Sequence, residues 1–379
     1  MSAPAVRRQR VSNDRLRVLF AGGGTGGHLY PGLAIARALV REAPNVQPFF
    51  VGAQRGIEKE ILPTTEFPFA LLDLHPLYRT TPWNNWRTLG GGVRAWRALS
   101  KLARERVPTA VVGTGGYAAG VALAWARLHD IPTILHESNS HPGLTTRAFA
   151  GSAAAVYLAF PEAAERLRKG AHTDVRALGC PIDPPPLLRP SRAEARARWE
   201  LPADAFVVLV TGGSQGARAL NEAVAQWCAH GLPNGVALIW GTGRAQAAAY
   251  LDRDSATVRV RPYLAPIGDA YAAADLAVTR AGAMTIAELC AWGIPSVLVP
   301  LPTAAQDHQT CNARAVASTG GAVHVPQAEL SAESLDATVR ALIARPDQLA
   351  AMSRAALARG RPSSAADIAR AIHALLRAR

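Results

Sequence analysis

Cysteine and charge are scarce in this sequence, and each scarcity excludes a class of protein. The four cysteines, Cys180, Cys228, Cys290 and Cys311, include no C-x-x-C pair, so the sequence indicates neither a disulfide framework nor a zinc knuckle. Charged residues make up 18% of the 379 residues and hydrophobic residues 49%, which excludes wholesale disorder. We expect a folded chain of about two domains from a reducing compartment, with a large buried core.

Apolar runs that could enter a membrane are also short. Residues 107–126 carry no charge over 20 positions, nominally enough to span a bilayer. They contain Pro108 and four glycines, so they predict a strand, a glycine loop and a buried helix instead. The basic N-terminus is followed by an apolar run only at 19–21, too short for the hydrophobic part of a signal peptide. No transmembrane segment is therefore expected.

The charge balance is strongly basic. The 41 Lys and Arg residues exceed the 28 Asp and Glu residues and give a net charge of +13. A surplus of this size indicates an anionic partner, which is a nucleic acid, an anionic membrane or a phosphorylated substrate. Charge alone does not choose among the three.

Short β-branched runs lead repeatedly into glycine turns and then into alanine-rich runs. The segment LRVLFA leads into the glycines that begin at Gly22, and FVVLVT leads into GGSQGAR, which begins at Gly212. Strands that alternate with helices in this way predict parallel sheets. Because the two glycine loops lie 190 residues apart (212 − 22), we expect an α/β fold of two Rossmann-like domains that face each other across a cleft.

A proline-rich segment separates the two predicted halves. Residues 179–190, GCPIDPPPLLRP, carry five prolines, which prevent a helix and stiffen the crossing. We therefore predict an N-terminal domain over 1–180 and a C-terminal domain over 181–361. The last run, about 362–379, has helical apolar spacing and is expected to pack back on the N-terminal domain.

The first glycine loop allows several interpretations. It is a plain strand-to-helix turn, or it holds a phosphate, because glycines let the backbone approach a ligand and the next helix offers unpaired N–H groups. Gly22, Gly24 and Gly27 also satisfy G-x-G-x-x-G, but the acidic residue that a dinucleotide site needs about 20 residues on is missing. His28 closes the loop, and its imidazole either bonds locally at the helix start or takes a proton in the cleft.

Six motifs follow one another along the chain: GGTGGHLYPGLAIA, GTGGYAAG, HESN, GGSQGAR, TRAGAMTIAEL and DHQTCNA. In this order, from about Leu16 to the C-terminus, the sequence resembles the MurG family of bacterial N-acetylglucosaminyltransferases, the lipid II synthases of glycosyltransferase family 28. The resemblance implies the GT-B fold and a metal-independent, inverting transfer that needs no cofactor. It implies UDP-N-acetylglucosamine (UDP-GlcNAc) as the donor. The implied acceptor is the 4-hydroxyl of N-acetylmuramic acid (MurNAc) in undecaprenyl-pyrophosphate-linked MurNAc-pentapeptide, at the cytoplasmic face of the plasma membrane.

The resemblance also assigns donor contacts to positions in this sequence. Ser214 and Gln215 would contact the diphosphate and sugar of the donor. Glu288 would accept hydrogen bonds from the ribose hydroxyls, a role that suits a carboxylate, and Gln309 would reach the sugar. Taken alone, Glu288 is equally a solvated helix carboxylate. The other implied contacts are Thr25, Gly26, Gly27, Asn139, Leu264, Ala281, Gly282, Ala283, Met284, Thr285 and Ile286.

The catalytic assignment falls on two residues. His28 is the predicted general base, and Glu137 of the HESN motif is the weaker candidate. The sequence departs from the family at the crossover, where an N-P-x-R pattern is usual and this chain ends its C-P-I-D tetrapeptide with Asp183. Either helix N-termini and another arginine, such as Arg189, neutralise the diphosphate, or the donor binds more weakly.

A possible metal motif has a simpler interpretation. The tripeptide DRD at 252–254 has the spacing that metal-dependent sugar-nucleotide transferases use. It lies between a helical run and the strand TVRVR, where a solvated loop is the better prediction. No metal site is expected, so oriented N–H groups and a helix dipole must stabilise the leaving diphosphate.

One segment combines tryptophan with arginine. Residues 83–106 contain several basic residues. The same segment places four apolar side chains at helical spacing, those of Trp86, Leu89, Val93 and Trp96. Three glycines at 90–92 are expected to interrupt a single helix. The stripe either faces the core or lies in the headgroup region of an anionic membrane. Because a lipid-anchored acceptor requires the enzyme at the bilayer, we favour membrane contact, including Trp125 on the neighbouring uncharged helix.

Two rival functions remain open. UDP-GlcNAc 2-epimerases share the two-domain architecture but turn over the donor without a lipid acceptor. A nucleic-acid-binding protein is suggested only by the net charge and predicts a steep salt dependence of binding. It has no need for a glycine loop in each half, so no nucleic acid partner is expected.

Overall fold

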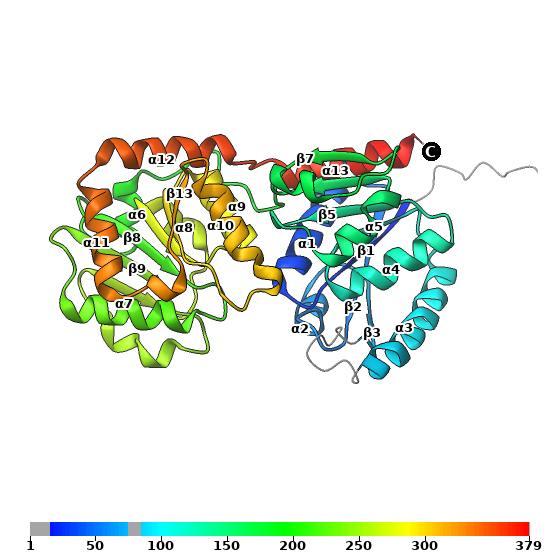
Figure 1. The fold of residues 1–379 in the computed structure, drawn as a ribbon, viewed down its shortest axis with the longest axis horizontal. Helices are drawn as coiled ribbons and strands as arrows, with labels where there is room; N and C mark the ends of the chain where they lie inside the picture. The colour runs from blue at the N-terminus through cyan, green and yellow to red at the C-terminus, as the bar shows by residue number, and fades with distance from the viewer. Residues whose placement is uncertain (1–15, 75–84, 379) are drawn as a thin grey trace, which may run out of the picture. The chain divides into compact units, whose positions relative to one another are not determined.

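The structure is a computed structural model that describes residues 16–74 and 85–378, with no side chains described for 85–90. Strands and helices alternate along the chain and form two parallel sheets (Figure 1). This is the α/β architecture that the glycine loops predict.

Helices connect successive strands, as in βαβ units. The strand runs LRVLFA and FVVLVT each lead through a glycine loop into a helix, α1 and α7, which confirms the two predicted Rossmann-like starts. The α-helices are α1 (Gly26–Glu42), α2 (Glu58–Ile61), α3 (Asn85–Glu105), α4 (Gly116–Leu128), α5 (Leu144–Phe149), α6 (Arg192–Arg198), α7 (Arg218–His230), α8 (Ile267–Ala273), α9 (Ala283–Trp292), α10 (His308–Ala317), α11 (Ala332–Ile343), α12 (Pro346–Arg359) and α13 (Ser364–Arg377).

The first sheet has the strand order β3-β2-β1-β4-β5-β6-β7. Its strand β1 pairs in parallel with β2 and with β4, and residues 18–21 of β1 are at most 1% exposed. A continuous apolar run is typical of a parallel strand that is covered on both faces. The strands are β1 (Leu16–Gly22), β2 (Val46–Ala53), β3 (Phe69–Leu72), β4 (Ala110–Gly115), β5 (Thr133–Glu137), β6 (Ala155–Leu158) and β7 (Asp174–Ala177).

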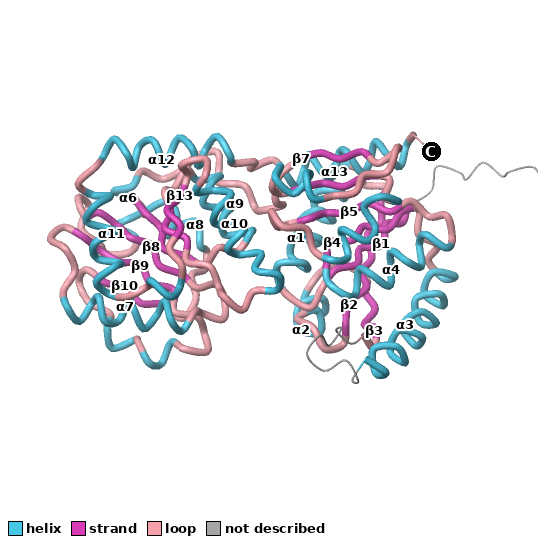
Figure 2. The backbone as a smooth tube through the Cα atoms, viewed as in Figure 1, coloured by secondary structure: helices cyan, strands magenta, loops and turns pink. Residues whose placement is uncertain are grey.

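The second sheet has the strand order β10-β9-β8-β11-β12-β13. Val208 and Val210 of β8 belong to an apolar cluster with Trp227 of α7, whereas Val207 and Leu209 belong to another cluster, with α6 and α8. Because alternate side chains of a strand point to opposite faces, helices cover both faces of this sheet (Figure 2). The strands are β8 (Phe206–Thr211), β9 (Val236–Gly241), β10 (Val258–Arg261), β11 (Leu276–Thr279), β12 (Ser296–Leu298) and β13 (Ala322–His324).

The chain divides into two compact units, residues 1–134 with 369–379, and residues 135–368. The predicted boundary after residue 180 lies between the strands of the two sheets but is not the boundary of these units, so the predicted domain limits stay a prediction. The last run forms a helix, α13, as expected. Within the first unit its Arg370 pairs with Glu42 at the end of α1, at 3.2 Å.

Residues 107–126 form β4 and most of α4, which confirms the predicted strand, glycine loop and helix. Two expectations nearby were wrong. The glycines at 90–92 do not interrupt α3, which runs unbroken over 21 residues. Trp125 is 4% exposed, because its ring stacks on His129 and its Nε1 donates a hydrogen bond to the Ser100 hydroxyl of α3 at 3.0 Å. No helix within 16–74 and 85–378 is long and apolar enough to cross a membrane.

A buried ion pair ties α6 to the start of β11. Arg196 Nη2 lies 2.6 Å from Asp275 Oδ2, and the two side chains are 10% and 11% exposed. Removing one partner of such a pair leaves the other charge buried, which costs about 3–5 kcal/mol. We expect Asp275→Ala to lower the free energy of unfolding of the second unit by about that amount, as measured by urea unfolding with tryptophan fluorescence.

The exposed pair Arg198–Asp269, at 2.8 Å, supplies the matched control. Since exposed ion pairs contribute about 0–1 kcal/mol, Asp269→Ala should change the unfolding free energy by less than about 1 kcal/mol. Equal effects of the two substitutions would contradict the role given to the Arg196–Asp275 pair.

Candidate active site

The first glycine loop holds His28 in the first turn of α1. His28 Nδ1 lies 3.2 Å from the Gly23 carbonyl oxygen and 3.3 Å from the Thr25 hydroxyl. Because a carbonyl oxygen only accepts hydrogen bonds, these partners assign the proton to Nδ1 and leave the lone pair on Nε2. His28 can therefore accept a proton at Nε2, as the role of a general base requires.

The GTGG motif leaves room for this imidazole. A Cβ atom at Gly115 would lie 2.6 Å from Cδ2 of His28, so a larger residue there would displace the ring. Gly26 and Gly27 begin α1, whose first turn contains no acidic residue. The first unit thus brings together Thr25, Gly26, Gly27 and His28 at the positive end of a helix, which suits an anionic ligand.

Both carboxylate oxygens of Glu137 accept hydrogen bonds from neighbouring residues. Its Oε1 accepts hydrogen bonds from the backbone N–H of Asn139 at 3.0 Å and, at 3.4 Å, from the Asn139 side chain. Its Oε2 accepts from the Gly143 N–H at 2.9 Å and from the Thr146 hydroxyl at 2.6 Å. Both oxygens therefore hold the loop that follows β5, a geometry that favours a positioning role over proton transfer.

Asn139 meets Asn312, a residue that the sequence analysis missed. Asn312 is fully buried in α10, and its Oδ1 accepts from the Ser140 N–H at 2.8 Å. Its Nδ2 donates to Asn139 Oδ1 at 3.1 Å and to the Ala281 carbonyl at 3.3 Å. Asn312 thus joins the HESN, TRAGAM and DHQTCN motifs within residues 135–368. The motif DHQTCNA contains Asn312, but nothing in the sequence indicated its partners.

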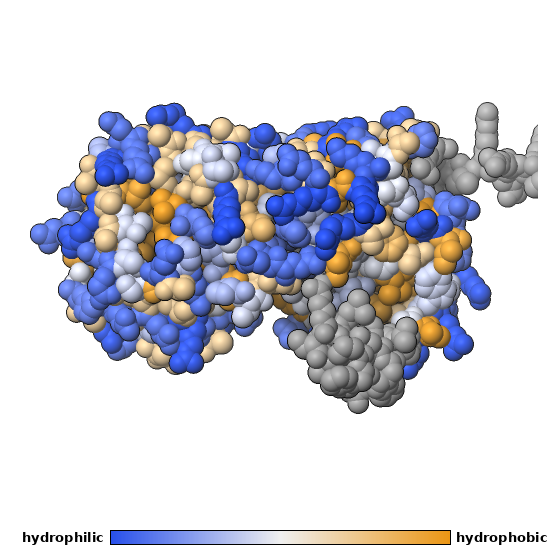
Figure 3. All heavy atoms as spheres, viewed as in Figure 1, coloured by the Kyte–Doolittle hydropathy of each residue, from blue (hydrophilic) through white to orange (hydrophobic). Residues whose placement is uncertain are grey.

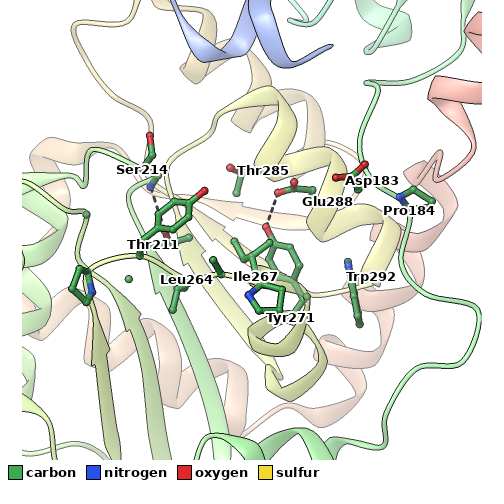
Figure 4. Close-up of a pocket in the computed structure, with 18 of the residues that line it drawn as sticks. Asp183, Pro184, Thr211, Ser214, Leu264, Ile267, Tyr271, Thr285, Glu288 and Trp292 are labelled. Carbon is green, nitrogen blue, oxygen red and sulfur yellow. Dashed lines mark hydrogen bonds between the residues drawn. The ribbon is translucent and has the colours of Figure 1, made fainter. Parts of the chain in front are cut away.

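A pocket of about 500 Å³ opens at the carboxyl ends of β8 and β9; we call it the Glu288 pocket (Figure 4). Ser214 of the second glycine loop forms part of its wall, together with Thr285 and Glu288 of α9 and with Leu264 in the loop after β10. The volume falls in the range of about 300–1,000 Å³ typical of small-molecule sites. The pocket therefore brings together four of the predicted donor contacts.

Glu288 is anchored by Tyr271, a second residue that the sequence analysis missed. The Tyr271 hydroxyl donates to Glu288 Oε2 at 2.7 Å (Figure 4). Burial raises the pKa of Glu288, the Tyr271 hydrogen bond lowers it, and the charge of Asp183 raises it. One carboxylate oxygen, Oε1, remains for a ligand. Nothing in the run GDAYAAAD marked its tyrosine as a partner of α9.

The Glu288 pocket is acidic. Asp183, the residue in place of the family arginine, lines it together with Glu288, and no described lining residue is Lys, Arg or His. Arg189 does not supply the missing cation in this structure. Its guanidinium lies over the Trp292 ring at 4.8 Å and donates to the carbonyls of Ala291 and Trp292.

The segment 281–286 contributes less to this pocket than the resemblance implies. Thr285 lines the pocket, but Ala281, Ala283 and Ile286 are at most 9% exposed and pack in an apolar cluster. Gly282 precedes α9 as its N-cap, and Met284 is half-buried. The segment therefore offers a ligand its backbone and Thr285 rather than most of its side chains.

Two further predicted contacts of the second unit, Gln309 and Gln215, do not line the Glu288 pocket. Gln309 lines a second pocket, of about 420 Å³, together with Arg280 and Gln327, and its Oε1 accepts from the Leu301 N–H at 2.9 Å. Gln215 is exposed in the glycine loop and lines neither pocket.

Backbone packing fixes the second glycine loop. Gly216 has φ +77° and Gly243, in the loop after β9, has φ +85°. A Cβ at Gly216 would lie 2.1 Å from the Thr242 carbonyl oxygen, and one at Gly243 would lie 2.1 Å from the Gly216 nitrogen. Only glycine fits at either position, so two loop backbones touch directly.

The DRD tripeptide lies in a short turn, and Asp254 is engaged within the protein. Asp252 and Arg253 belong to a short 3₁₀ turn, and Asp254 accepts from the Val260 N–H and pairs with Arg261 at 3.1 Å. Within residues 16–74 and 85–378 no three His, Cys, Asp or Glu side chains are grouped so that they could hold a metal ion.

The protein has two parallel sheets, each with a glycine loop after a central strand. A nucleotide-sized pocket lies at the carboxyl ends of strands of the second sheet. These features define the GT-B class of sugar-nucleotide proteins. The chain belongs to glycosyltransferase family 28. The family's N-terminal domain matches residues 18–158 and its C-terminal domain matches residues 207–371.

The relatives share most of the chain's length. The UDP-N-acetylglucosamine--N-acetylmuramyl-(pentapeptide) pyrophosphoryl-undecaprenol N-acetylglucosamine transferase of Desulforudis audaxviator is 41% identical over 92% of this chain and 95% of its own. The crystal structure of Acinetobacter baumannii MurG has a TM-score of 0.74 at 28% identity and covers 94% of this chain and 99% of its own. A putative UDP-N-acetylglucosamine 2-epimerase from Listeria monocytogenes has a TM-score of 0.64 at 13% identity over 94% of this chain and 96% of its own, a likeness of fold alone.

The raised pKa of Glu288 predicts its titration. In ¹³C NMR spectra of carboxyl-labelled protein, Glu288 should titrate above the ordinary value of 4.5, and Tyr271→Phe should raise its midpoint further, because that hydrogen bond lowers the pKa. Between 4.5 and the raised pKa the folded state holds a proton that the unfolded chain has released. The resulting stability is present at low pH and is lost as the pH rises through the pKa of Glu288.

Glu66 provides an internal control in the same spectra. The hydrogen bond from Arg37 lowers the pKa of Glu66, so this residue should titrate below 4.5 and should not respond to Tyr271→Phe. A Glu288 midpoint that Tyr271→Phe leaves in place would show that the two side chains are not bonded in solution.

Proposed function

We propose that this chain transfers GlcNAc from UDP-GlcNAc to the 4-hydroxyl of MurNAc in undecaprenyl-pyrophosphate-linked MurNAc-pentapeptide. The observation that carries the proposal is the Glu288 pocket, in which a tyrosine-anchored carboxylate offers Oε1 to the ribose hydroxyls. The sequence identity to the named transferases, which extends over most of this chain, supports the same substrates for this protein. The alternative epimerase activity is supported only by a likeness of fold.

The reaction is a single displacement at the anomeric carbon. The acceptor oxygen forms a bond to C1 of GlcNAc while the bond from C1 to the UDP oxygen breaks, and UDP leaves with the electron pair. His28 Nε2 takes the acceptor proton. Because the acceptor attacks the face opposite the leaving group, the anomeric configuration inverts. Backbone N–H groups of the second glycine loop stabilise the charge that develops on the departing diphosphate.

We propose that α3 places the enzyme at the anionic, cytoplasmic face of the plasma membrane. Arg97, Lys101 and Arg104 lie exposed at helical spacing, and Val93 on the same helix is 54% exposed. Hydrophobic and hydrophilic side chains are interleaved over α3 and α4 in Figure 3. Arg94 is engaged with Asp73 at 2.7 Å, and the side chain of Trp86 lies outside the described residues.

One assay tests the activity. Release of UDP from UDP-GlcNAc should require the lipid-linked MurNAc-pentapeptide and should yield a disaccharide-linked lipid product. Incubation with the donor alone should leave UDP-GlcNAc unchanged. An epimerised sugar or UDP release in that arm would overturn the proposed transfer in favour of the epimerase.

Substitution of His28 tests the general base. His28→Ala should lower turnover with the lipid acceptor by about 10²- to 10⁴-fold, because that is the usual contribution of a general base. The Kd for UDP should stay near the parent value. Glu137→Gln is the comparison: it should lower stability through the lost loop contacts, and a larger loss of turnover in folded Glu137→Gln than in His28→Ala would move the base to Glu137.

Charge reversal on α3 tests the membrane contact. Arg97→Glu with Lys101→Glu should reduce co-sedimentation with vesicles that contain about one-third anionic lipid, since each basic residue near such a surface contributes about 1 kcal/mol. The matched control is Arg345→Glu with Arg354→Glu, two exposed arginines of the second unit with the same change in net charge. If both double variants lose binding equally, net charge rather than α3 holds the protein on the vesicles.

A further inference from the structure

Glu58 begins α2 and is a fully buried carboxylate of the first unit. Its Oε1 accepts hydrogen bonds from the backbone N–H of Ala53 at 3.1 Å and from that of Gly24 at 3.0 Å. Its Oε2 is buried and has no hydrogen-bond partner in the described part of the chain. Burial of a polar atom without a partner costs free energy, so packing alone does not explain a carboxyl group at this position.

Three glycines enclose this carboxylate. A Cβ at Gly23 would lie 1.6 Å from Oε1 of Glu58, and one at Gly56 would lie 2.0 Å from its Oε2. A Cβ at Gly52 would lie 2.7 Å from its Cβ. These distances are far shorter than van der Waals contact. The carboxylate therefore reaches the first glycine loop only because side chains are absent on three sides.

The peptide group between Gly23 and Gly24 connects Glu58 to His28. Its N–H group, on Gly24, donates to Glu58 Oε1 at 3.0 Å. Its carbonyl oxygen, on Gly23, accepts from His28 Nδ1 at 3.2 Å. Because the peptide bond is trans, the N–H and the carbonyl point in opposite directions. The carboxylate, the peptide group and the imidazole thus form a chain of two hydrogen bonds, in which each bond polarises the next.

Other titratable side chains also surround the loop. Tyr30 of α1 and Tyr117 of α4 face it, since their rings would lie 3.1 and 3.0 Å from Cβ atoms built at its glycines. A phenol ordinarily ionises near pH 10, far above the range in which an imidazole titrates. On α2 itself, Lys59 and Glu60 are exposed, so solvent screens their charges. Glu58 is the buried carboxylate that is bonded to the loop.

We propose that Glu58 is a positioning residue for the general base. Through the Gly23–Gly24 peptide group it holds the Nδ1 proton of His28 in place and stabilises the imidazolium that forms when Nε2 takes the acceptor proton. The carboxylate polarises the peptide N–H, which makes the carbonyl oxygen a stronger acceptor for the Nδ1 proton. That proton stays on Nδ1, and Glu58 exchanges none. The role rests on the proposed function, which gives the imidazole a proton to accept.

NMR spectra of ¹⁵N-histidine-labelled protein test the connection without requiring catalysis. The ring signals of His28 are assigned by their absence from the spectrum of His28→Ala. Glu58→Gln keeps an oxygen acceptor for the two N–H groups but removes the charge. The titration midpoint of His28 should fall by about 0.5 pH unit, because a carboxylate favours the imidazolium and its effect passes through the peptide group.

Glu66 supplies the matched control in the same unit. It is exposed and pairs with Arg37 of α1, the helix that carries His28, at 2.9 Å. Glu66→Gln makes the same chemical change and the same change in net charge as Glu58→Gln. It should leave the midpoint of His28 at the parent value.

Kinetics with the lipid acceptor test the role in the reaction. Glu58→Gln should lower kcat by about tenfold with both KM values near those of the parent, since a hydrogen bond to a charged group is roughly twice as strong as a neutral one. The acid limb of its kcat–pH profile should move to lower pH together with the NMR midpoint. A purely structural loss would lower kcat without moving this limb, and that result would overturn the proposal.

Failure of the proposal and failure of the proposed function give different results. An unchanged His28 midpoint in folded Glu58→Gln, in an enzyme that transfers GlcNAc, would show that Glu58 only supports the loop. A shifted midpoint in a protein that transfers no sugar would refute the proposed function, and the catalytic role of Glu58 with it.

Two further measurements apply if Glu58→Gln fails to fold. Gly56→Ala should lower the His28 midpoint without changing the net charge, because its Cβ displaces the carboxylate. In the parent protein, the amide signals of Gly24 should move as His28 titrates, since one peptide group links the two residues. Gly24 signals that stay constant through that titration would overturn the proposal.

Discussion

Direct contact between two loop backbones is the constraint on which the second unit's site depends. The glycine loop after β8 can lie on the loop after β9 only because Gly216 and Gly243 have no side chain. The contact fixes the course of the loop and the start of α7, and residues of this loop line both the Glu288 pocket and the second pocket, which contains Gln309. The walls of both pockets therefore depend on the absence of two Cβ atoms.

Backbone groups and supporting side chains also set the positions of the predicted site residues. Glycine loops supply N–H groups, while side chains such as Tyr271 and Asn312 position other side chains. Glu137 belongs with these positioning residues, since four hydrogen bonds tie it to the loop after β5. His28, whose Nδ1 lies 3.2 Å from the Gly23 carbonyl oxygen, stays the predicted general base.

The sequence predicts the parts of the fold that are set locally. Alternating strand and helix patterns led to β1, α1, β8 and α7, and motif resemblance led to Glu288, because both signals lie within a few adjacent residues. Contacts between distant residues were not predictable. The Tyr271–Glu288 bond, the Asn312 junction and the burial of Trp125 against Ser100 all arise when separate helices pack together. Three glycines in α3 suggested a break, but the helix is continuous, and Ala95, Leu99 and Ala103 beyond the glycines are buried.

The aspartate at the crossover has a consequence for the end of the catalytic cycle. The carboxyl groups of Asp183 and Glu288 both line the Glu288 pocket, no described lining residue is a cation, and ionised carboxylates repel a negatively charged ligand group. Repulsion of this kind acts on the product as well as on the substrate, and it acts more strongly once UDP gains charge on leaving the sugar. Under the proposed function, an aspartate at this position would therefore act on the departure of UDP as well as on the binding of the donor.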